Sequence, residues 1–285
     1  MTTYPGGKGG AGVCQQIINQ MPPHALYIEA FLGSGAVLRA KKPARSSIAI
    51  EIDAHTLIEF CDNRPDRPAR SDIPDLTVIC GDAISWLAQA AANGALGDDT
   101  LIYCDPPYVR SSRRSPRDLY KFEMTDKQHL ELLNLLDSLD CLVIISGYYS
   151  DLYDQRLRGW RMHYFQTSTH GGTPATEFLW MNYPPPIELH DYRYLGNNFR
   201  EREKLKRRKA RWLARLQRMQ PIERYAMLDA IESYRSQPSE VTIPTIADIA
   251  ATSEPAAPPQ PASMASTATS DEGRRQPSPE LTTEN

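Results

Sequence analysis

Short apolar runs alternate with amphipathic stretches between about residues 24 and 180, and this alternation is the main pattern of the sequence. Runs of this length, bounded by polar or glycine-containing segments, are typical of buried strands. The five clearest runs are 26–28, 47–50, 76–80, 101–104 and 142–145. Two further candidates for strands are 161–166 and 178–183.

The clearest predicted helix covers residues 125–139. Thr125 and Gln128 have the spacing of a capping box, in which side chains and backbone amides at a helix start satisfy one another. Leucines at positions 132, 133, 135, 136 and 139 give this stretch a broad apolar face. A shorter helix is predicted from Gly35 to about Lys41. Strands that alternate with helices indicate an α/β fold with a Rossmann-like, doubly wound and mostly parallel sheet.

The pattern changes near Pro184, and three regions are predicted. Residues 1–190 form the α/β domain. Residues 191–235 form a short basic helical extension, because 193–218 holds eleven Lys or Arg against two acids and a last helix is indicated over 222–234. Residues 236–285 are rich in Pro, Ala, Ser and Thr, and we expect this tail to be disordered because it has little apolar surface to bury.

Composition narrows the function classes. The chain has 285 residues, is 41% hydrophobic and 24% charged, and has a formal net charge of −3, so attraction to phosphate has to come from local patches. Its five cysteines are scattered without a Cys-x-x-Cys pair, which suits a reduced cytosol and argues against a zinc site. No apolar run approaches a membrane span and the N-terminus has no signal-type segment. We therefore expect a cytoplasmic protein without metal or membrane partner.

Acidic residues stand where four of the predicted strands end. They are Glu29, Glu51, Asp82 and Asp105. Ligands of doubly wound sheets bind at the carboxyl edge of the strands, and the acid after the second strand commonly holds ribose hydroxyls. Asp82 fits either an acceptor for an adenine amino group or a helix cap. Acids along this edge without a lysine cradle suit a ligand with hydroxyls, an amine and a sulfonium.

A glycine turn follows the first strand, in the segment Phe31-Leu32-Gly33-Ser34-Gly35. Glycines let the backbone bend sharply and approach a ligand closely. The third glycine of the dinucleotide-binding pattern is replaced by Leu38, and no Lys-Ser/Thr follows as in a phosphate-binding loop. The turn therefore indicates a nucleotide-type site of another kind.

The tetrapeptide Asp105-Pro106-Pro107-Tyr108 follows the fourth strand. Two prolines end a strand and stiffen the turn after it. The Asp105 carboxylate and the Pro106 carbonyl can accept the two hydrogens of an amino group, and the Tyr108 ring can stack on a planar base. Without its neighbours the tetrapeptide is more typical of a surface turn.

Taken in order, these motifs resemble those of the Dam-type N6-adenine DNA methyltransferases. This family uses S-adenosylmethionine and carries an F-x-G-x-G cofactor motif followed by a D-P-P-Y catalytic motif. The resemblance extends to Tyr4-Pro5-Gly6-Gly7-Lys8, to Ser146-Gly147-Tyr148 and to 177–180, and it covers about residues 4–183. It implies a class I methyltransferase fold, S-adenosylmethionine as cofactor and double-stranded DNA as partner.

The resemblance also implies a role for each matching residue. Tyr4 would pack near the cofactor and Lys8 would reach its carboxylate. Glu51 would hold the ribose hydroxyls beside Asp53. The methionine part would lie against Phe31, Gly33 and Gly35, and the cofactor adenine near Asp82. Asp105, Pro106 and Tyr108 would be catalytic, with Asp105 also serving the cofactor side.

One departure from the family concerns DNA recognition. The family usually has a sizeable recognition segment before D-P-P-Y, whereas residues 54–100 are nearly filled by predicted helices and a strand, and only 61–75 is irregular. The loop 109–121 is a second candidate for DNA contact, through Arg110, Arg113, Arg114 and Arg117. The basic stretch 193–218 fits a phosphate contact and a solvated face equally well.

Several readings stay open from the sequence. Adenine in RNA presents the same amine as adenine in DNA, and a catalytically inert DNA-binding module of the same fold is a second alternative. Glutamine methyltransferases have Asn and N4-cytosine enzymes usually Ser where Asp105 stands, so both are disfavoured. The recognised DNA site, the oligomeric state and the biological role, whether restriction–modification, phage protection or regulation, do not follow from the sequence.

Overall fold

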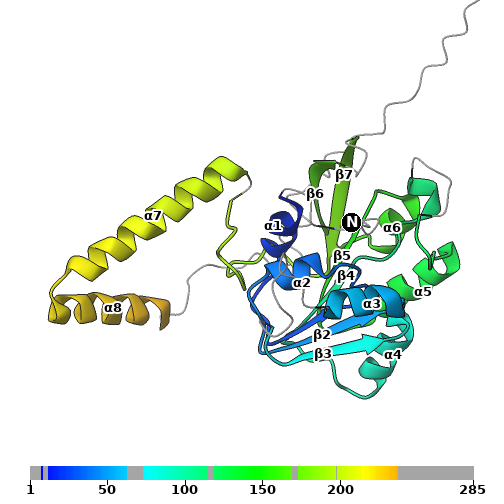
Figure 1. Ribbon diagram of the computed structural model, residues 1–285, viewed down its shortest axis with the longest axis horizontal. Helices are drawn as coiled ribbons and strands as arrows, with labels where there is room; N and C mark the ends of the chain where they lie inside the picture. The colour runs from blue at the N-terminus through cyan, green and yellow to red at the C-terminus, as the bar shows by residue number, and fades with distance from the viewer. Residues whose placement is uncertain are drawn as a thin grey trace, which may run out of the picture. The chain divides into compact units, whose positions relative to one another are not determined.

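The computed structural model of the protein contains a seven-stranded mixed sheet with helices packed on it (Figure 1). The structure describes residues 8, 12–62, 73–113, 119–168, 173–196 and 198–236. The strands are β1 (Leu26–Glu29), β2 (Ser46–Glu51), β3 (Leu76–Cys80), β4 (Thr100–Cys104), β5 (Leu142–Gly147), β6 (Arg161–Ser168) and β7 (Pro174–Met181). Their order across the sheet is β3-β2-β1-β4-β5-β7-β6.

The strand order places a topological switch point between β1 and β4. From β1 the chain proceeds to β2 and β3 on one side, and it then returns to build β4 and β5 on the other side. These five strands are parallel, while β7 pairs antiparallel with both β5 and β6. The predicted doubly wound, mostly parallel sheet is confirmed. In such sheets the crevice beyond the carboxyl ends of the two strands at the switch point is the expected ligand site.

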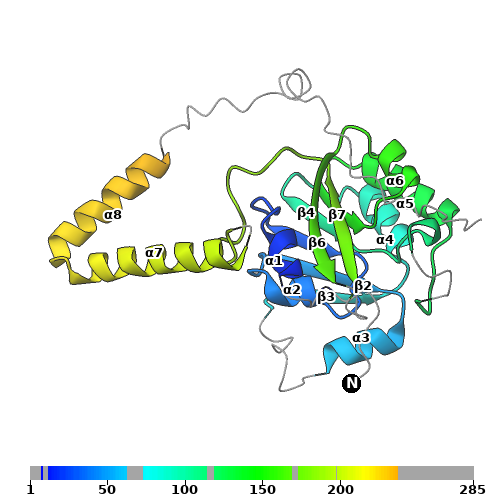
Figure 2. The same cartoon turned by 90° about the horizontal axis from the view of Figure 1, so that it is seen from above.

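Helices cover both faces of the sheet. They are α1 (Val13–Ile18), α2 (Ala36–Ala40), α3 (Ala54–Cys61), α4 (Ala83–Ala92), α5 (Asp126–Asp137) and α6 (Asp151–Arg156). Figure 2 shows α1 and α2 on one side and α4, α5 and α6 on the other. Alternate side chains of β4 enter different cores: Leu101 and Tyr103 pack with α1, α2 and α3, and Ile102 packs with α4, α5 and α6.

The strand predictions agree with the structure to within a few residues, except at β7. The predicted run 178–183 captured only the buried half of β7, because Pro174 to Thr176 are polar or partly exposed and carry no apolar signal. The capping box is present at the start of α5, as predicted. Two six-residue helices, α1 and α6, were not predicted, because six residues are too few for a periodic pattern to stand out.

Two further helices follow the sheet. They are α7 (Phe199–Arg218), which begins later than the basic stretch 193–218, and α8 (Pro221–Ser236). Neither contains a buried residue. The tail expected from residue 237 onward lies outside the described residues. In the part of the chain that the structure covers, none of the helices combines the length and apolar character needed to cross a membrane.

Candidate active site

The glycine turn after β1 has the bent backbone that its sequence predicts. Gly33 and Gly35 have φ angles of 50° and 64°, in the left-handed region that side chains disfavour. A Cβ at Gly35 would also lie 2.4 Å from Cε2 of Phe60, so this glycine lets α2 pack closely on α3. Phe31 and Gly33 line the cavity described below, whereas Gly35 stands behind it as the N-cap of α2.

The acid at the end of β2 is tied to this turn. Glu51 accepts hydrogen bonds from the Gly33 amide, at 2.8 Å, and from the Asp53 amide, at 2.9 Å. Burial raises the pKa of Glu51 above its ordinary value, although the two amide hydrogen bonds act to lower it. A carboxylate has about four acceptor positions, so Glu51 can still accept from ligand hydroxyls. Glu51 is the last residue of β2, and its contact with ribose hydroxyls stays a prediction.

The Asp105 carboxylate is held by residues far away in the sequence. Lys8 Nζ donates to Asp105 Oδ1 at 2.6 Å, and Ser146 Oγ donates to the same oxygen at 2.8 Å. Lys8 Nζ also lies 3.2 Å from Glu177 Oε1 and donates to the hydroxyl of Tyr108. Lys8 is therefore bound to two carboxylates, Asp105 directly after β4 and Glu177 on β7. Ser146, near the end of β5, supplies the second donor to Asp105.

Ionisation in this group follows from its burial. Burial alone would lower the pKa of Lys8, but Asp105 and Glu177 outweigh that effect and raise it, so the amine is protonated at neutral pH. Burial raises the pKa of Glu177, although Lys8 opposes this rise. Lys8 is 7% exposed and its charge is therefore neutralised by protein groups rather than by water.

Asp105 keeps one oxygen for a ligand. Lys8 and Ser146 both donate to Oδ1, and within the described residues Oδ2 receives no hydrogen bond. The side chain is 17% exposed and lines the cavity, so Oδ2 is open to an incoming donor. A fixed carboxylate with one free oxygen can accept a hydrogen from an amine.

Tyr108 is in a different position from the one expected for a stacking residue. It is 7% exposed, its hydroxyl donates to Glu177, and its ring meets the ring of Tyr148 edge-on at a centroid distance of 4.6 Å. Neither Tyr108 nor Pro106 lines the cavity, whereas Pro107 does. In this conformation Tyr108 positions Lys8 and Glu177, and its ring faces are not open to a base.

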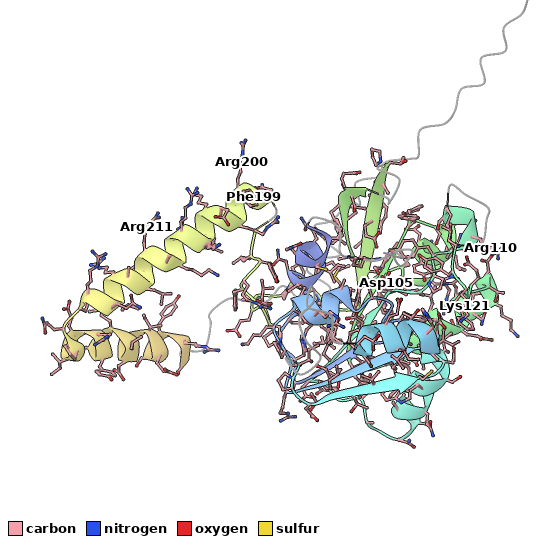
Figure 3. The ribbon with its side chains drawn as sticks, in the orientation of Figure 1. Asp105, Arg110, Lys121, Phe199, Arg200 and Arg211 are labelled. Carbon is pink, nitrogen blue, oxygen red and sulfur yellow. The ribbon has the colours of Figure 1, made fainter. Side chains whose placement is uncertain are left out.

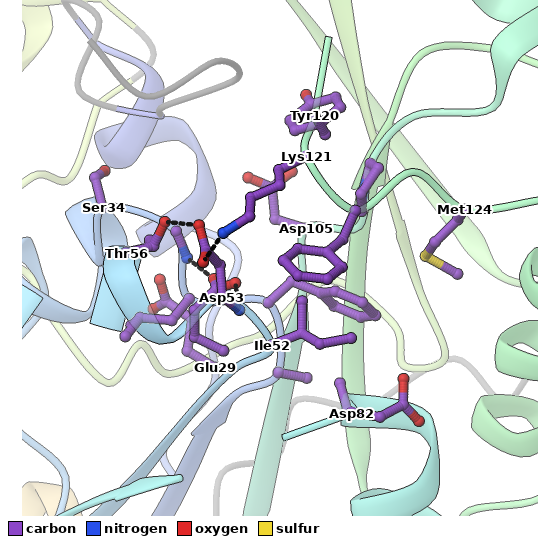
Figure 4. A pocket seen from close by; sticks show the side chains of 18 of the residues that line it. Glu29, Ser34, Ile52, Asp53, Thr56, Asp82, Asp105, Tyr120, Lys121 and Met124 are labelled. Carbon is purple, nitrogen blue, oxygen red and sulfur yellow. Dashed lines mark hydrogen bonds and ion pairs between the residues drawn. The ribbon is translucent and has the colours of Figure 1, made fainter. Parts of the chain in front are cut away.

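A cavity of about 510 Å³ lies along the carboxyl ends of β1, β2, β3 and β4. Figure 4 shows Glu29, Asp53, Asp82 and Asp105 around it. Sequence reasoning placed Glu29, Glu51, Asp82 and Asp105 on one edge of the sheet, and all four line this cavity. Sequence reasoning missed the opposite wall of the cavity. The segment 119–124 forms this wall with Tyr120, Lys121, Phe122 and Met124.

Two ion pairs hold this opposite wall. Lys121 Nζ donates to Asp53 Oδ1 at 2.8 Å, bridging the segment 119–124 and the N-cap of α3 (Figure 4). Arg113 makes two hydrogen bonds to Glu123, at 2.8 and 2.6 Å, and is 4% exposed. The Arg113 guanidinium lowers the pKa of Glu123 to about 2. No signal in the sequence indicated either of these two pairings.

The four arginines predicted to contact DNA do not share one environment in the structure. Arg113, buried and paired with Glu123, is committed to the loop and is not presented to solvent. Arg110 is exposed, at the start of a 3₁₀ turn that ends at Ser112. Arg114, Arg117 and the predicted cofactor contact Tyr4 lie outside the described residues.

Asp82 lines the cavity and also caps α4, because its carboxylate accepts a hydrogen bond from the Ser85 amide at 2.8 Å. The two functions considered for Asp82, a contact to the cofactor adenine and a helix cap, are therefore compatible.

The buried carboxyl group of Glu29 makes the stability of the protein depend on pH. It is buried, it accepts a hydrogen bond from Tyr27 at 2.8 Å, and burial raises its pKa from 4.5 to about 8. Between these two values the unfolded chain has released the proton that the folded protein still holds. Stability therefore falls as pH rises from 4.5 to 8, by up to about 1.4 kcal/mol per pH unit.

We expect Glu29→Gln to lose most of that dependence, because Gln cannot ionise. Urea unfolding of both proteins at pH 6 and pH 8.5 measures it, with exposed Glu131→Gln as the control that keeps the wild-type slope. Parallel pH dependence of wild type and Glu29→Gln would contradict a raised pKa.

Comparison with known proteins supplies structural likeness only. No family model matches the chain. No curated protein matches it either. A SAM-dependent methyltransferase from Agrobacterium tumefaciens is 16% identical, with 60% of each chain covered and a TM-score of 0.41. A Streptococcus mutans protein solved in complex with SAH is 13% identical, with 64% of this chain and 99% of that chain covered and a TM-score of 0.37.

A precorrin decarboxylase from Methanobacterium thermoautotrophicum is 14% identical, with 63% of this chain and 94% of that chain covered and a TM-score of 0.42. The alignment spans less than two thirds of the Agrobacterium protein's length. Function is therefore inferred below from the geometry of the site.

Proposed function

We propose that this protein transfers a methyl group from S-adenosylmethionine to the N6 amino group of an adenine in double-stranded DNA. One observation carries the proposal. Asp105 stands at the carboxyl end of β4, beside the switch point, with Oδ1 bound by Lys8 and Ser146 and Oδ2 open to the cavity. A neutral amine donor facing that oxygen would complete its hydrogen bonding.

The cavity suits S-adenosylmethionine by its donor set. Glu51 offers acceptor positions for the two ribose hydroxyls at the end of β2. Ile52 and Phe122 are each about two-fifths exposed and both line the cavity, so they provide apolar faces for the cofactor adenine. The acids along this edge favour a cationic sulfonium over a polyphosphate. The residues present therefore fit this cofactor.

The resemblance implied that Lys8 reaches the carboxylate of the cofactor. Its amine is engaged by Asp105, Glu177 and Tyr108, which leaves it poorly placed to be the principal partner of a cofactor carboxylate. We propose that Lys8 instead sets the charge and position of Asp105. Lys8 lines the cavity, so its positive charge lies close enough to influence bound groups electrostatically.

When bound, the cofactor supplies an activated methyl group on a positively charged sulfur. The amine of adenine is a weak nucleophile because its lone pair is delocalised into the ring. Asp105 Oδ2 would accept one of its hydrogens and favour a pyramidal nitrogen with a localised lone pair. The Pro106 carbonyl, expected from the sequence to accept the other hydrogen, belongs to a residue that does not line the cavity. Asp105 Oδ2 would also take up the proton that the amine loses. Positioning and electrostatics then account for much of the catalysis, without a covalent intermediate on the protein.

The target base has to leave the duplex to reach this site. The sequence assigned stacking on that base to Tyr108, whose ring is buried here. Stacking by Tyr108 would require its ring to separate from Tyr148. Tyr120, which lines the cavity and is only partly buried, offers a ring face without such a change. Base stacking on an aromatic ring contributes about 1–3 kcal/mol.

The test is direct. The full chain is incubated with methyl-labelled cofactor and either plasmid from a host without adenine methylation or an RNA transcript of the same sequence. Nucleosides are then separated and identified by mass spectrometry. We expect label in N6-methyladenine from DNA. Label in N4-methylcytosine, or in RNA alone, would contradict the proposed substrate, and cofactor binding by calorimetry without any transfer would favour the inert module.

A further inference from the structure

Helix α7 carries a continuous row of basic side chains along one side. We name this row the α7 basic ridge, and its members are Arg200, Lys204, Arg207, Arg208, Arg211, Arg215 and Arg218. Apart from the neighbours Arg207 and Arg208, successive members are three or four residues apart, so they share one face of a helix with 3.6 residues per turn. All seven are exposed. Figure 3 shows Arg200 and Arg211, three turns apart, pointing to the same side of α7.

The acids of α7 lie off the ridge. Glu203 is 3.8 Å from Lys206, which faces away from the ridge, and Glu201 interacts with the N-cap residue Asn198. Within the described residues, no ridge side chain forms an ion pair with a carboxylate. The ridge charges are therefore not neutralised by the helix itself.

Charge is distributed very unevenly in this protein. Helix α7 has ten Lys or Arg against two Glu, a net charge of +8. The whole chain has −3, so the residues outside α7 sum to −11. That remainder repels a polyanion, and a DNA substrate needs a local positive surface to be held. The ridge supplies one.

We infer that the α7 basic ridge binds the phosphate backbone of duplex DNA without reading its sequence. The inference rests on the proposed function, because it assigns the surface that holds the substrate of the same reaction. Six of the seven ridge residues are Arg, whose guanidinium matches phosphate geometry in two hydrogen bonds. The two ends of the ridge, Arg200 and Arg218, are eighteen positions apart, which is about 27 Å of helix and long enough to follow several phosphates.

Leu205, Trp212 and Leu216 form an apolar strip beside the ridge on α7, and the Arg215 guanidinium lies 5.7 Å from the centroid of the Trp212 ring. Basic and apolar faces on one helix also occur in segments that bind anionic membranes. DNA is favoured here because the proposed reaction already requires a polyanionic substrate, and the rest of the protein repels it. Binding to a membrane is an outcome that the experiment distinguishes.

The experiment compares two triple variants of the full chain. Arg207→Gln, Arg211→Gln and Arg215→Gln together remove three ridge charges. Arg45→Gln, Lys127→Gln and Lys206→Gln remove three exposed charges that are not part of the ridge, and serve as the matched control. Gln and Arg have similar helix propensities, so α7 should persist, which circular dichroism checks. Affinity for a random-sequence duplex is measured by fluorescence anisotropy from 50 to 300 mM salt.

We expect the slope of log K against log salt to become less steep by about 2.7 in the ridge variant, since each phosphate contact contributes about 0.9. The control should change by less than about 0.5 on the same scale. The ridge variant should keep its kcat at saturating DNA and show a raised KM for DNA. Equal slopes in wild type and ridge variant would overturn the inference. So would loss of binding to phosphatidylserine vesicles with DNA binding intact.

Failure of the proposed function has a separate signature. In that case the wild type methylates no adenine in DNA, although the ridge variant still loses salt-dependent duplex binding. An unchanged slope in a protein that methylates DNA overturns the ridge alone.

Discussion

Asp105→Asn is expected to lower kcat for methyl transfer by roughly 10²–10⁴-fold, the range for losing a positioned acid–base group. Asn keeps the shape of Asp and a carbonyl oxygen for Ser146, which donates to Oδ1 at 2.8 Å in the wild type. Its amide group, however, presents hydrogens where Oδ2 was an acceptor, so it cannot accept from the target amine. The measurement is single-turnover transfer of labelled methyl to plasmid DNA.

Two controls make this result specific. Calorimetry with S-adenosylmethionine checks that the variant still forms the cofactor site. Glu131→Gln removes an exposed carboxylate of α5 and should retain wild-type turnover. Near-normal turnover of Asp105→Asn would remove Asp105 from the mechanism, and with it the observation on which the proposed function rests.

The second large effect concerns stability. Lys8→Met should lower the free energy of unfolding by about 3–5 kcal/mol, because removing one member of a buried ion pair leaves its partners uncompensated. Lys8 and Glu177 are both almost fully buried, and Asp105 is 2.6 Å from the Lys8 amine. Urea unfolding measured by circular dichroism gives the difference. An exposed counterpart, Lys206→Met, should cost less than about 1 kcal/mol.

A double variant separates charge from packing in this group. Lys8→Met together with Glu177→Gln removes one positive and one negative charge, so we expect it to be more stable than Lys8→Met alone by at least about 1 kcal/mol. The hydroxyl of Tyr108 can still donate to the Gln oxygen. If the double variant is as unstable as the sum of the two single variants, the cost of losing Lys8 lies in packing and not in uncompensated charge.

The sequence predicted the central strands well because each is a short apolar run with polar ends. The same holds for the start of α5, where Thr125 and Gln128 form their capping box within a single turn. It also placed the acids Glu51, Asp82 and Asp105 on one sheet edge, because parallel strands end on the same side. These inferences needed only local pattern and the rules of strand connection.

Other features depended on contacts that no local pattern encodes. Arg113 was expected to face DNA, and it is instead paired with Glu123 ten residues later. Tyr108 was expected to present its ring to a base, and its hydroxyl instead joins Lys8 to Glu177 in the interior. The wall formed by Tyr120, Lys121 and Phe122 was missed for the same reason, since an irregular segment has no periodicity to read.

The sequence by itself therefore determined the parallel strands, the acidic residues at their ends and the stiff turn at Asp105, because neighbouring residues specify strands, caps and turns. Only the tertiary structure decided which oxygen of Asp105 is free. Its ion-pair partner Lys8 stands 97 residues earlier in the chain, and Ser146 stands 41 residues later. The charge and orientation of a buried carboxylate are fixed by the groups that replace its water, and those groups meet only when distant segments pack together.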